Sequence, residues 1–136
     1  MNLPHAAAAL CSVWLGALVA ISFLEAPLKF RAPGMTVPVA LSVGRLVFAA
    51  LNRMELLLLA AAVAAGLGCG RAAVLALPAV LLLAQVLLLR PRMDRRAVRV
   101  IAGEPVPRSR LHVAYVAAEG AKAVVLVAAA VLLGTS

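Results

Sequence analysis

Charged side chains are scarce in this sequence, and so are aromatic ones. Of the 136 residues, 13% are Asp, Glu, Lys or Arg and 4% are Phe, Trp or Tyr, whereas 65% are hydrophobic. A soluble domain has about 25% charged and about 45–50% apolar residues, so this composition excludes an ordinary soluble fold. A membrane-spanning helix needs about 20 apolar residues, which leaves room for four or five spans and no separate soluble domain. We predict one all-α integral membrane domain over residues 1–136.

Residues that bind metals or form disulfides are also rare. The chain has two cysteines, Cys11 and Cys69, and two histidines, His5 and His112, with no CxxC or HExxH spacing. It also has no Ser-His-Asp arrangement, Gly-rich phosphate loop or redox motif. We therefore expect no metal and no cofactor, and an enzyme is the less favoured class of protein. The cysteines either pack as small apolar residues, which we favour, or form a disulfide between the first two helices.

Four apolar runs are long enough to span a bilayer. A charged stretch that begins at Glu25 and contains Pro27 and Pro33 separates the first run from a long helix starting near Met35. At about 1.5 Å per residue this helix exceeds the roughly 30 Å hydrocarbon core, so its first turns should lie at the membrane surface. A basic loop of residues 90–110 precedes the last run. The predicted spans of the four-helix bundle are residues 6–24, 46–67, 72–89 and 111–133.

Positive charge outweighs negative charge, with a formal net charge of +8. Four spans place the first and third connections on one side, which holds Lys29, Arg31 and seven arginines, whereas only Arg71 lies clearly on the other. The positive-inside rule then puts both basic connections in the cytoplasm and both termini outside. The lack of targeting signals and the Ala/Arg-rich composition favour a bacterial-type inner (plasma) membrane. Anionic lipid headgroups are the expected partner of the basic loop, and nothing in it resembles a nucleic-acid recognition module. The seven arginines are Arg90, Arg92, Arg95, Arg96, Arg99, Arg108 and Arg110.

Several ionisable residues lie inside the apolar runs, where each costs about 2.5 to 3.5 kcal/mol at a helix centre and therefore tends to face protein or water. Helical spacing puts those of one span on one face. Glu55 and Glu119 both lie roughly 10 to 13 Å from the cytoplasmic ends of their spans, so they can meet. We predict one polar cluster open to the cytoplasm; the alternative is that these residues only fix the helix register. The candidates are Glu25, Arg45, Asn52, Arg53, Glu55, His112, Tyr115, Glu119 and Lys122.

Short motifs along the chain resemble a known family of membrane proteins. The chain carries Trp14-Leu-Gly16, then Glu25-Ala-Pro27-Leu-Lys29-Phe30, then Gly44-Arg45-Leu-Val-Phe48 with Asn52, and finally a basic third loop with His112 early in the last helix. This arrangement resembles the transmembrane-protein-205-like domain. That family consists of small four-helix integral membrane proteins of poorly defined molecular activity. The resemblance therefore implies an architecture rather than a reaction.

A narrower set of residues resembles a second family. Arg45, Asn52 and Glu55 are similar to the Arg, Asn and Glu motif of the membrane-associated eicosanoid and glutathione metabolism family. The resemblance implies four spans and glutathione bound near the cytoplasmic side, between subunits of a trimer. The chain departs from that family at Ala49, where a second Arg would stand. Its third span also lacks the Tyr and Arg that bind and activate glutathione, and Tyr115 is on the fourth span instead.

Three functions are compatible with these features. The favoured one is an accessory or interaction subunit, either a homo-oligomer or a partner of another membrane subunit, because small residues such as Ala114, Ala118 and Ala121 support helix association. The second is a small oligomeric transporter or proton-coupled protein that uses Glu55 and Glu119. The third is a glutathione-dependent membrane enzyme.

Overall fold

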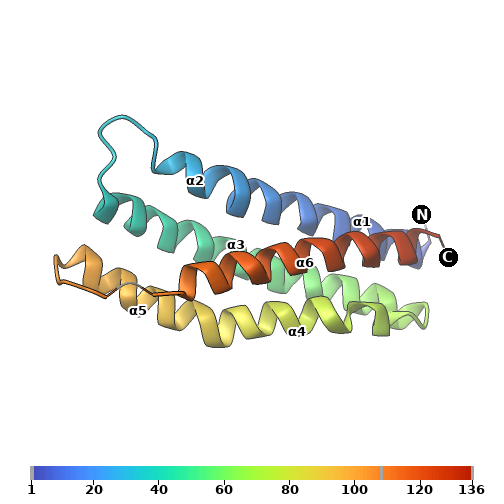
Figure 1. Ribbon diagram of the computed structural model, residues 1–136. Helices are drawn as coiled ribbons and strands as arrows, with labels where there is room; N and C mark the ends of the chain where they lie inside the picture. The colour runs from blue at the N-terminus through green and yellow to red at the C-terminus, as the bar shows by residue number, and fades with distance from the viewer. Residues whose placement is uncertain (1, 108, 136) are drawn as a thin grey trace.

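The computed structural model describes residues 2–107 and 109–135. These residues form four long helical segments that lie alongside one another, and no β-strand occurs among them (Figure 1). The prediction of an all-α bundle with four membrane-spanning helices is confirmed, because each segment is long and apolar enough to cross a membrane. The segments are Leu3–Lys29, Val37–Gly68, Ala72–Ile101 and Leu111–Gly134.

Two of the four segments change helical type along their length, whereas α3 (Val37–Gly68) and α6 (Leu111–Gly134) are α-helical throughout. The first segment consists of α1 (Leu3–Leu18), the π-helical η1 (Val19–Glu25) and α2 (Ala26–Lys29). The third consists of the 3-10 helix η2 (Ala72–Leu75), α4 (Ala76–Ala84), the π-helical η3 (Gln85–Leu89) and α5 (Arg90–Ile101).

Local sequence explains where the helices begin and turn. The side chain of Asn2 accepts a hydrogen bond from the backbone N–H of His5 at 3.1 Å, and that of Thr36 accepts one from Val39 at 3.4 Å. These polar caps satisfy N–H groups that have no partner inside the helix. Gly70 has a φ of 74°, a backbone conformation that glycine adopts without strain, and it reverses the chain between α3 and η2.

Two stretches predicted as loops are helical instead. The first segment continues to Lys29 rather than ending before Glu25, and α5 occupies the first half of the predicted basic loop 90–110. Only residues 102–110 connect α5 to α6, and Arg108 lies outside the described residues. Ion pairs four residues apart stabilise both extensions: Glu25 with Lys29 at 3.6 Å, and Arg90 with Asp94 at 3.8 Å.

The π-helical turns are the reason that these helices continue through proline. A proline lacks the N–H that an α-helix donates to the carbonyl four residues earlier, and its ring clashes with that carbonyl. The residues four positions before Pro27 and Pro91 lie in η1 and η3, where hydrogen bonds span five residues instead. The N–H of Ala26, for example, donates to the carbonyl of Ile21. Sequence reasoning read each proline as a helix end because it did not anticipate these wider turns.

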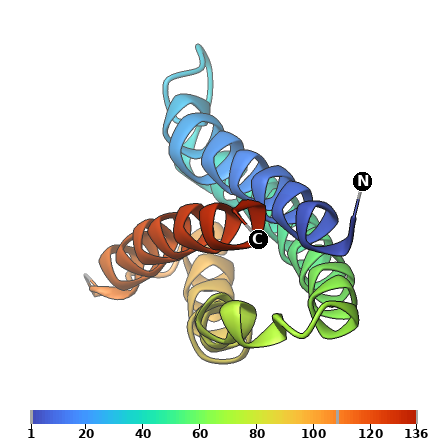
Figure 2. The ribbon, with the colours of Figure 1, turned by 90° about the vertical axis from the view of Figure 1, so that its right-hand side faces the viewer.

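The two ends of the bundle differ in charge. The end that carries the α2–α3 and α5–α6 connections holds Lys29, Arg31 and the arginines of α5, and we call it the basic end. Both termini lie at the opposite end, which we call the terminal end, close to Arg71 (Figure 1). At the terminal end α1 and α6 lie side by side, and they diverge toward the basic end (Figure 2).

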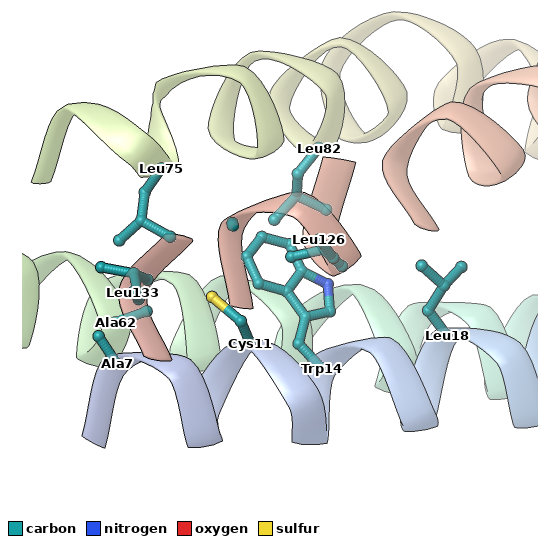
Figure 3. Packing of buried hydrophobic residues seen from close by; sticks show 10 residues of the cluster. Ala7, Cys11, Trp14, Leu18, Ala62, Leu75, Leu82, Leu126 and Leu133 are labelled. Atoms are coloured by element: carbon teal, nitrogen blue, oxygen red, sulfur yellow. The ribbon is translucent and has the colours of Figure 1, made fainter. Parts of the chain in front are cut away.

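The apolar core occupies the terminal half of the bundle. The Trp14 indole packs against Cys11 of α1, Leu82 of α4 and Leu126 of α6, and none of these side chains is exposed (Figure 3). Alanines complete the cluster and let the helices approach closely, which favours packing in a membrane. Both cysteines are free thiols, Cys11 within this core and Cys69 at the α3–η2 turn. The core therefore fills the space between the four helices on this side.

Candidate functional site: a buried ion cluster beneath a basic cavity

An ammonium group and two carboxylates meet in the middle of the bundle. Lys122 Nζ lies 2.5 Å from Glu55 Oε2 and 2.8 Å from Glu119 Oε1. At most 1% of any of these three side chains is exposed. Isolated buried charges are costly, so each group depends on the others for its stability. Two carboxylates share the single ammonium, and Glu55 Oε1 has no hydrogen-bond partner among the described residues.

Neutral polar groups complete this network and connect all four helical segments. The Trp14 indole N–H donates to Glu55 Oε2 at 2.6 Å. The amide of Gln85 donates to Glu119 Oε1 at 2.7 Å and accepts from Lys122 Nζ at 2.6 Å. Ser22 Oγ donates to Glu119 Oε2. We call the six residues the ion cluster: Trp14, Ser22, Glu55, Gln85, Glu119 and Lys122.

Both π-helical segments supply a hydrogen bond to the same carboxylate. Ser22 belongs to η1 and Gln85 to η3, and they donate to the two different oxygens of Glu119. A π-helical turn rotates the residues that follow it relative to an α-helix and is often found at functional sites. The irregular turns and the buried carboxylate therefore form one structural unit.

A cavity of about 380 Å³ lies between the ion cluster and the basic end. Its lining residues come from η1, α2, α3, α5 and α6, and Ser22 and Glu119 belong both to this lining and to the ion cluster. The volume falls in the range of roughly 300 to 1,000 Å³ typical of small-molecule sites. Four cationic side chains line it against two carboxylates: Lys29, Arg45, Arg90 and Arg96 against Asp94 and Glu119. The cavity is therefore both basic and, through its aromatic rings, partly apolar.

Arg90 is the central basic residue of the cavity wall. Its guanidinium carbon lies 4.7 Å from the ring centroid of Phe48 and 4.5 Å from that of Tyr115, and the two rings meet edge to face. The guanidinium is therefore within cation–π distance of both rings, which helps to hold it in place. Arg90 Nη1 lies 3.8 Å from Oδ1 of Asp94, which Arg45 also approaches at 3.9 Å.

The guanidinium of Arg90 has unused hydrogen-bond donors. Nε and Nη2 are buried without a hydrogen-bond partner among the described residues, although only 12% of the side chain is exposed. Nε of Arg96, on another cavity-lining residue, is also buried and without a partner there, and the unpaired groups of the lining include one acceptor, Oδ1 of Asp94. Buried polar groups are almost always paired, so this concentration of unpaired donors needs an explanation. An anion in the cavity would supply the acceptors.

The cavity is closed toward the terminal end. Beyond the ion cluster, the apolar core around Trp14 and Leu126 fills the bundle (Figure 3). The lining residues nearest the basic end, such as Arg45 and Ser109, are exposed. The cavity is therefore closed on the terminal side and reaches the surface at the basic end.

The structure divides the predicted polar cluster into separate groups. Glu55, Glu119 and Lys122 belong to the ion cluster, and Arg45, His112, Tyr115 and Glu119 line the cavity. Glu25 pairs with Lys29 instead, and Asn52 is buried with its Oδ1 unpaired among the described residues. Arg53 is exposed on α3, so its inclusion in one common cluster is wrong. Arg53 lies only two residues before Glu55 in the sequence, but helical geometry directs the two side chains to different faces of α3.

Sequence reasoning missed four residues that matter here. Three of them, Trp14, Ser22 and Gln85, are not among the predicted site residues. Gln85 carried a signal, because it is the only polar residue of the predicted third span 72–89. Arg90 falls in the predicted loop of residues 90–110, because Pro91 predicts the end of a helix. Its place beside Phe48 and Tyr115 depends on the helix continuing.

Comparison of the sequence with protein-family models, curated proteins and solved structures gives no significant match. The two family resemblances stay predictions. The chemistry of the cavity and of the ion cluster is therefore what indicates a function.

Proposed function

We propose that the protein is an accessory membrane protein that acts by binding an anionic molecule with an apolar part in the cavity. The observation that carries this proposal is Arg90, held between Phe48 and Tyr115 with two buried nitrogens unpaired among the described residues. Charge-assisted bonds from a guanidinium to a phosphate or carboxylate are strong and directional. The aromatic rings and the neighbouring cations favour a ligand that is negative at one end and apolar at the other.

The proposed orientation places the basic end in the cytoplasm and both termini outside, in a bacterial-type inner membrane. The support is the distribution of charge: α2 and α5 carry Lys29 and several arginines, whereas Arg71 lies at the terminal end. Basic residues accumulate on the cytoplasmic side of membrane proteins. In this orientation the cavity opens to the cytoplasm and is sealed from the outside.

We also propose that the chain associates with a membrane partner, either a second copy or another subunit. The support is a row of small residues on α6, where Ala114 and Ala121 are exposed and Ala118 is partly exposed. Such rows allow close approach between helices. Gly66 of α3 is also small, but it is buried against Ala72 within the chain and does not support association.

A proton-coupled transporter is the second candidate, and one specific observation favours it. Glu55 and Glu119 share the single ammonium of Lys122, and Glu119 also lines the cavity. Buried carboxylates of this kind mark proton pathways in many membrane proteins. Liposomes that contain the protein and a pH-sensitive dye should then acidify under an imposed potential, and Glu55→Gln should abolish this without loss of folded protein.

The glutathione-dependent enzyme is not proposed. Of the three residues that carried that resemblance, Arg45 lines the cavity, whereas Asn52 and Glu55 do not. Arg45 lies near Asp94 and Glu55 bonds with Lys122 and Trp14. The three side chains therefore do not form one binding surface in this chain.

Native mass spectrometry of protein extracted mildly from its own membrane tests the binding function. We expect an anionic molecule retained at one per chain in the wild type and lost in Arg90→Gln. Arg31→Gln is the matched control, because Arg31 is exposed at the same end of the bundle and does not line the cavity. The same spectrum gives the subunit number. Bare protein in the wild type, or equal retention in Arg90→Gln, would contradict the proposal.

A further inference from the structure

Exposed residues in the cavity lining indicate a side opening between η1–α2 and α6. These segments diverge toward the basic end in both views (Figures 1 and 2). The cavity is lined by Phe23 and Ala26 on one side of this divergence and by His112 and Val116 on the other. Phe23 is 42% exposed and Val116 41% exposed, so both lie at the cavity and at the outer surface of the bundle.

The opening lies within the depth of one lipid leaflet. Val116 is five residues into α6, which corresponds to roughly 7 to 8 Å along a helix that rises about 1.5 Å per residue. On the opposite side Phe23 stands a similar distance from Lys29, at the end of α2. Apolar side chains therefore flank the opening where acyl chains lie, and cationic side chains line the space behind it.

We propose that the cavity binds the headgroup of an anionic phospholipid that enters from the membrane through the opening between η1–α2 and α6. The phosphate pairs with the unpaired donors of Arg90, with Lys29 and Arg96 in the same lining, and the acyl chains leave between Phe23 and Val116. This inference rests on the proposed anion-binding function and specifies its ligand. Basic pockets between helices on the cytoplasmic side are the sites where anionic headgroups bind.

The geometry favours a lipid over a water-soluble anion of the same chemistry. A soluble ligand needs only the opening at the basic end. It would make no use of the exposed apolar residues Phe23 and Val116 at the depth of the acyl chains. A phospholipid uses both features, because its charge and its acyl chains lie on the two sides of the same glycerol group. The four cations against two carboxylates in the lining favour a headgroup with a net negative charge over a zwitterionic one, whose phosphate is accompanied by a cationic amine.

The test is lipid retention by the whole protein in nanodiscs that contain equal amounts of phosphatidylglycerol and phosphatidylcholine, measured by native mass spectrometry on release. We expect one phosphatidylglycerol per chain and at least a fivefold preference over phosphatidylcholine. Arg90→Gln should remove this preference, and Arg31→Gln should keep it. Equal retention of the two lipids by the wild type, or an unchanged preference in Arg90→Gln, would overturn the inference.

A second pair of variants tests the route through the opening. Val116→Trp places a large ring in the opening and should lower phosphatidylglycerol retention at least fivefold. Val113→Trp adds the same ring to the same helix at a residue that is 66% exposed and does not line the cavity, so it should have no effect. Equal retention in the two tryptophan variants would count against lateral entry.

A soluble probe separates failure of this inference from failure of the binding function. Phenyl phosphate has a phosphate and an aromatic ring but no acyl chain, and its binding to the detergent-solubilised protein can be measured by calorimetry. If it binds in an Arg90-dependent manner while phosphatidylglycerol is not retained, the lipid inference is wrong and the anion-binding function stands. If neither is bound, both are wrong.

Discussion

Lys122 is the residue on which the centre of the bundle depends most. It forms ion pairs with Glu55 and Glu119 and a hydrogen bond with Gln85, and its side chain is fully buried. Removal of one partner from a buried charge pair is far more damaging than replacement of all partners by neutral groups, because an uncompensated charge remains. Comparing the two kinds of substitution therefore shows whether charge balance in the ion cluster stabilises the fold.

Lys122→Met should therefore destabilise the protein by about 3–5 kcal/mol, since both carboxylates lose their counter-ion. The measurement is unfolding in detergent followed by circular dichroism. Adding Glu55→Gln and Glu119→Gln to Lys122→Met should restore most of the loss, because no charge then remains buried. Arg53→Met, at an exposed position on α3, is the control and should change little. A triple variant no more stable than Lys122→Met would show that charge balance is not what holds the cluster.

The unpaired nitrogens of Arg90, unlike the paired groups of the ion cluster, indicate binding rather than stabilisation of the fold. The ion cluster pairs nearly all of its groups within the chain, whereas the cavity wall leaves donors of Arg90 and Arg96 without a partner among the described residues. A fold stabilised by internal pairing alone would have no reason to keep them. At the scale of single residues, the ion cluster accounts for structure and the cavity wall for binding.

The π-helical turns show how an element can position a residue. η1 precedes Pro27 and brings Ser22 to Glu119, and η3 precedes Pro91 and brings Gln85 to the other oxygen of the same carboxylate. Rewinding either turn to an α-helix would shift the polar residue by about 100° around the helix axis, away from α6. Each proline should therefore be energetically coupled to the polar residue of the π-helical turn that precedes it.

A double-mutant cycle tests this coupling. Pro27→Ala restores a backbone N–H and permits rewinding, so we expect loss of the bond from Ser22 to Glu119 and destabilisation of about 1 kcal/mol. In the Ser22→Ala background there is no bond to lose, so the same substitution should be neutral or stabilising. Both can be followed by unfolding in detergent. Additive effects of the two substitutions would show that η1 does not position Ser22.

The turn between α3 and η2 restricts residue size. A Cβ atom at Gly66 would lie 3.0 Å from Cα and 3.2 Å from N of Ala72, and the carbonyl of Gly66 accepts from Arg71 N–H at 2.7 Å. Gly66→Ala should therefore destabilise the protein by about 1–3 kcal/mol through overpacking. Gly120→Ala, with nothing within 4 Å, should stabilise α6 by about 0.5–1 kcal/mol. The measurement is thermal unfolding, and an equal response of both variants would contradict this account.

At the scale of the whole molecule, hydropathy predicts the fold because a bilayer permits few alternatives. Apolar runs must be helices, and four of them make a bundle. Helical spacing and depth also predicted that Glu55 and Glu119 would meet. What the sequence did not reveal was how far helices extend beyond the apolar runs: α5 continues past Pro91 and places Arg90 in the cavity wall. The site could be predicted only where it lies within the spans.

The orientation of the whole molecule has a direct test. A membrane-impermeant maleimide applied to intact cells should label Thr135→Cys and leave Ser109→Cys unlabelled, in a background with Cys11 and Cys69 replaced by Ala. Ser109 lines the cavity at the basic end, and Thr135 lies at the terminal end. Permeabilised cells should give labelling of both. The reverse pattern in intact cells would place the basic end outside and contradict the positive-inside assignment.

The central claim is that an anion binds to Arg90 inside the cavity. Solid-state NMR measures it most directly, through the dipolar coupling between lipid phosphorus and guanidinium nitrogen in phosphatidylglycerol bilayers. The rings of Phe48 and Tyr115 should shift the Arg90 signal away from those of exposed arginines, and Arg90→Gln assigns it by its disappearance. We predict a strong coupling at the Arg90 signal. Coupling at the exposed arginines alone, with none at Arg90, would contradict the account.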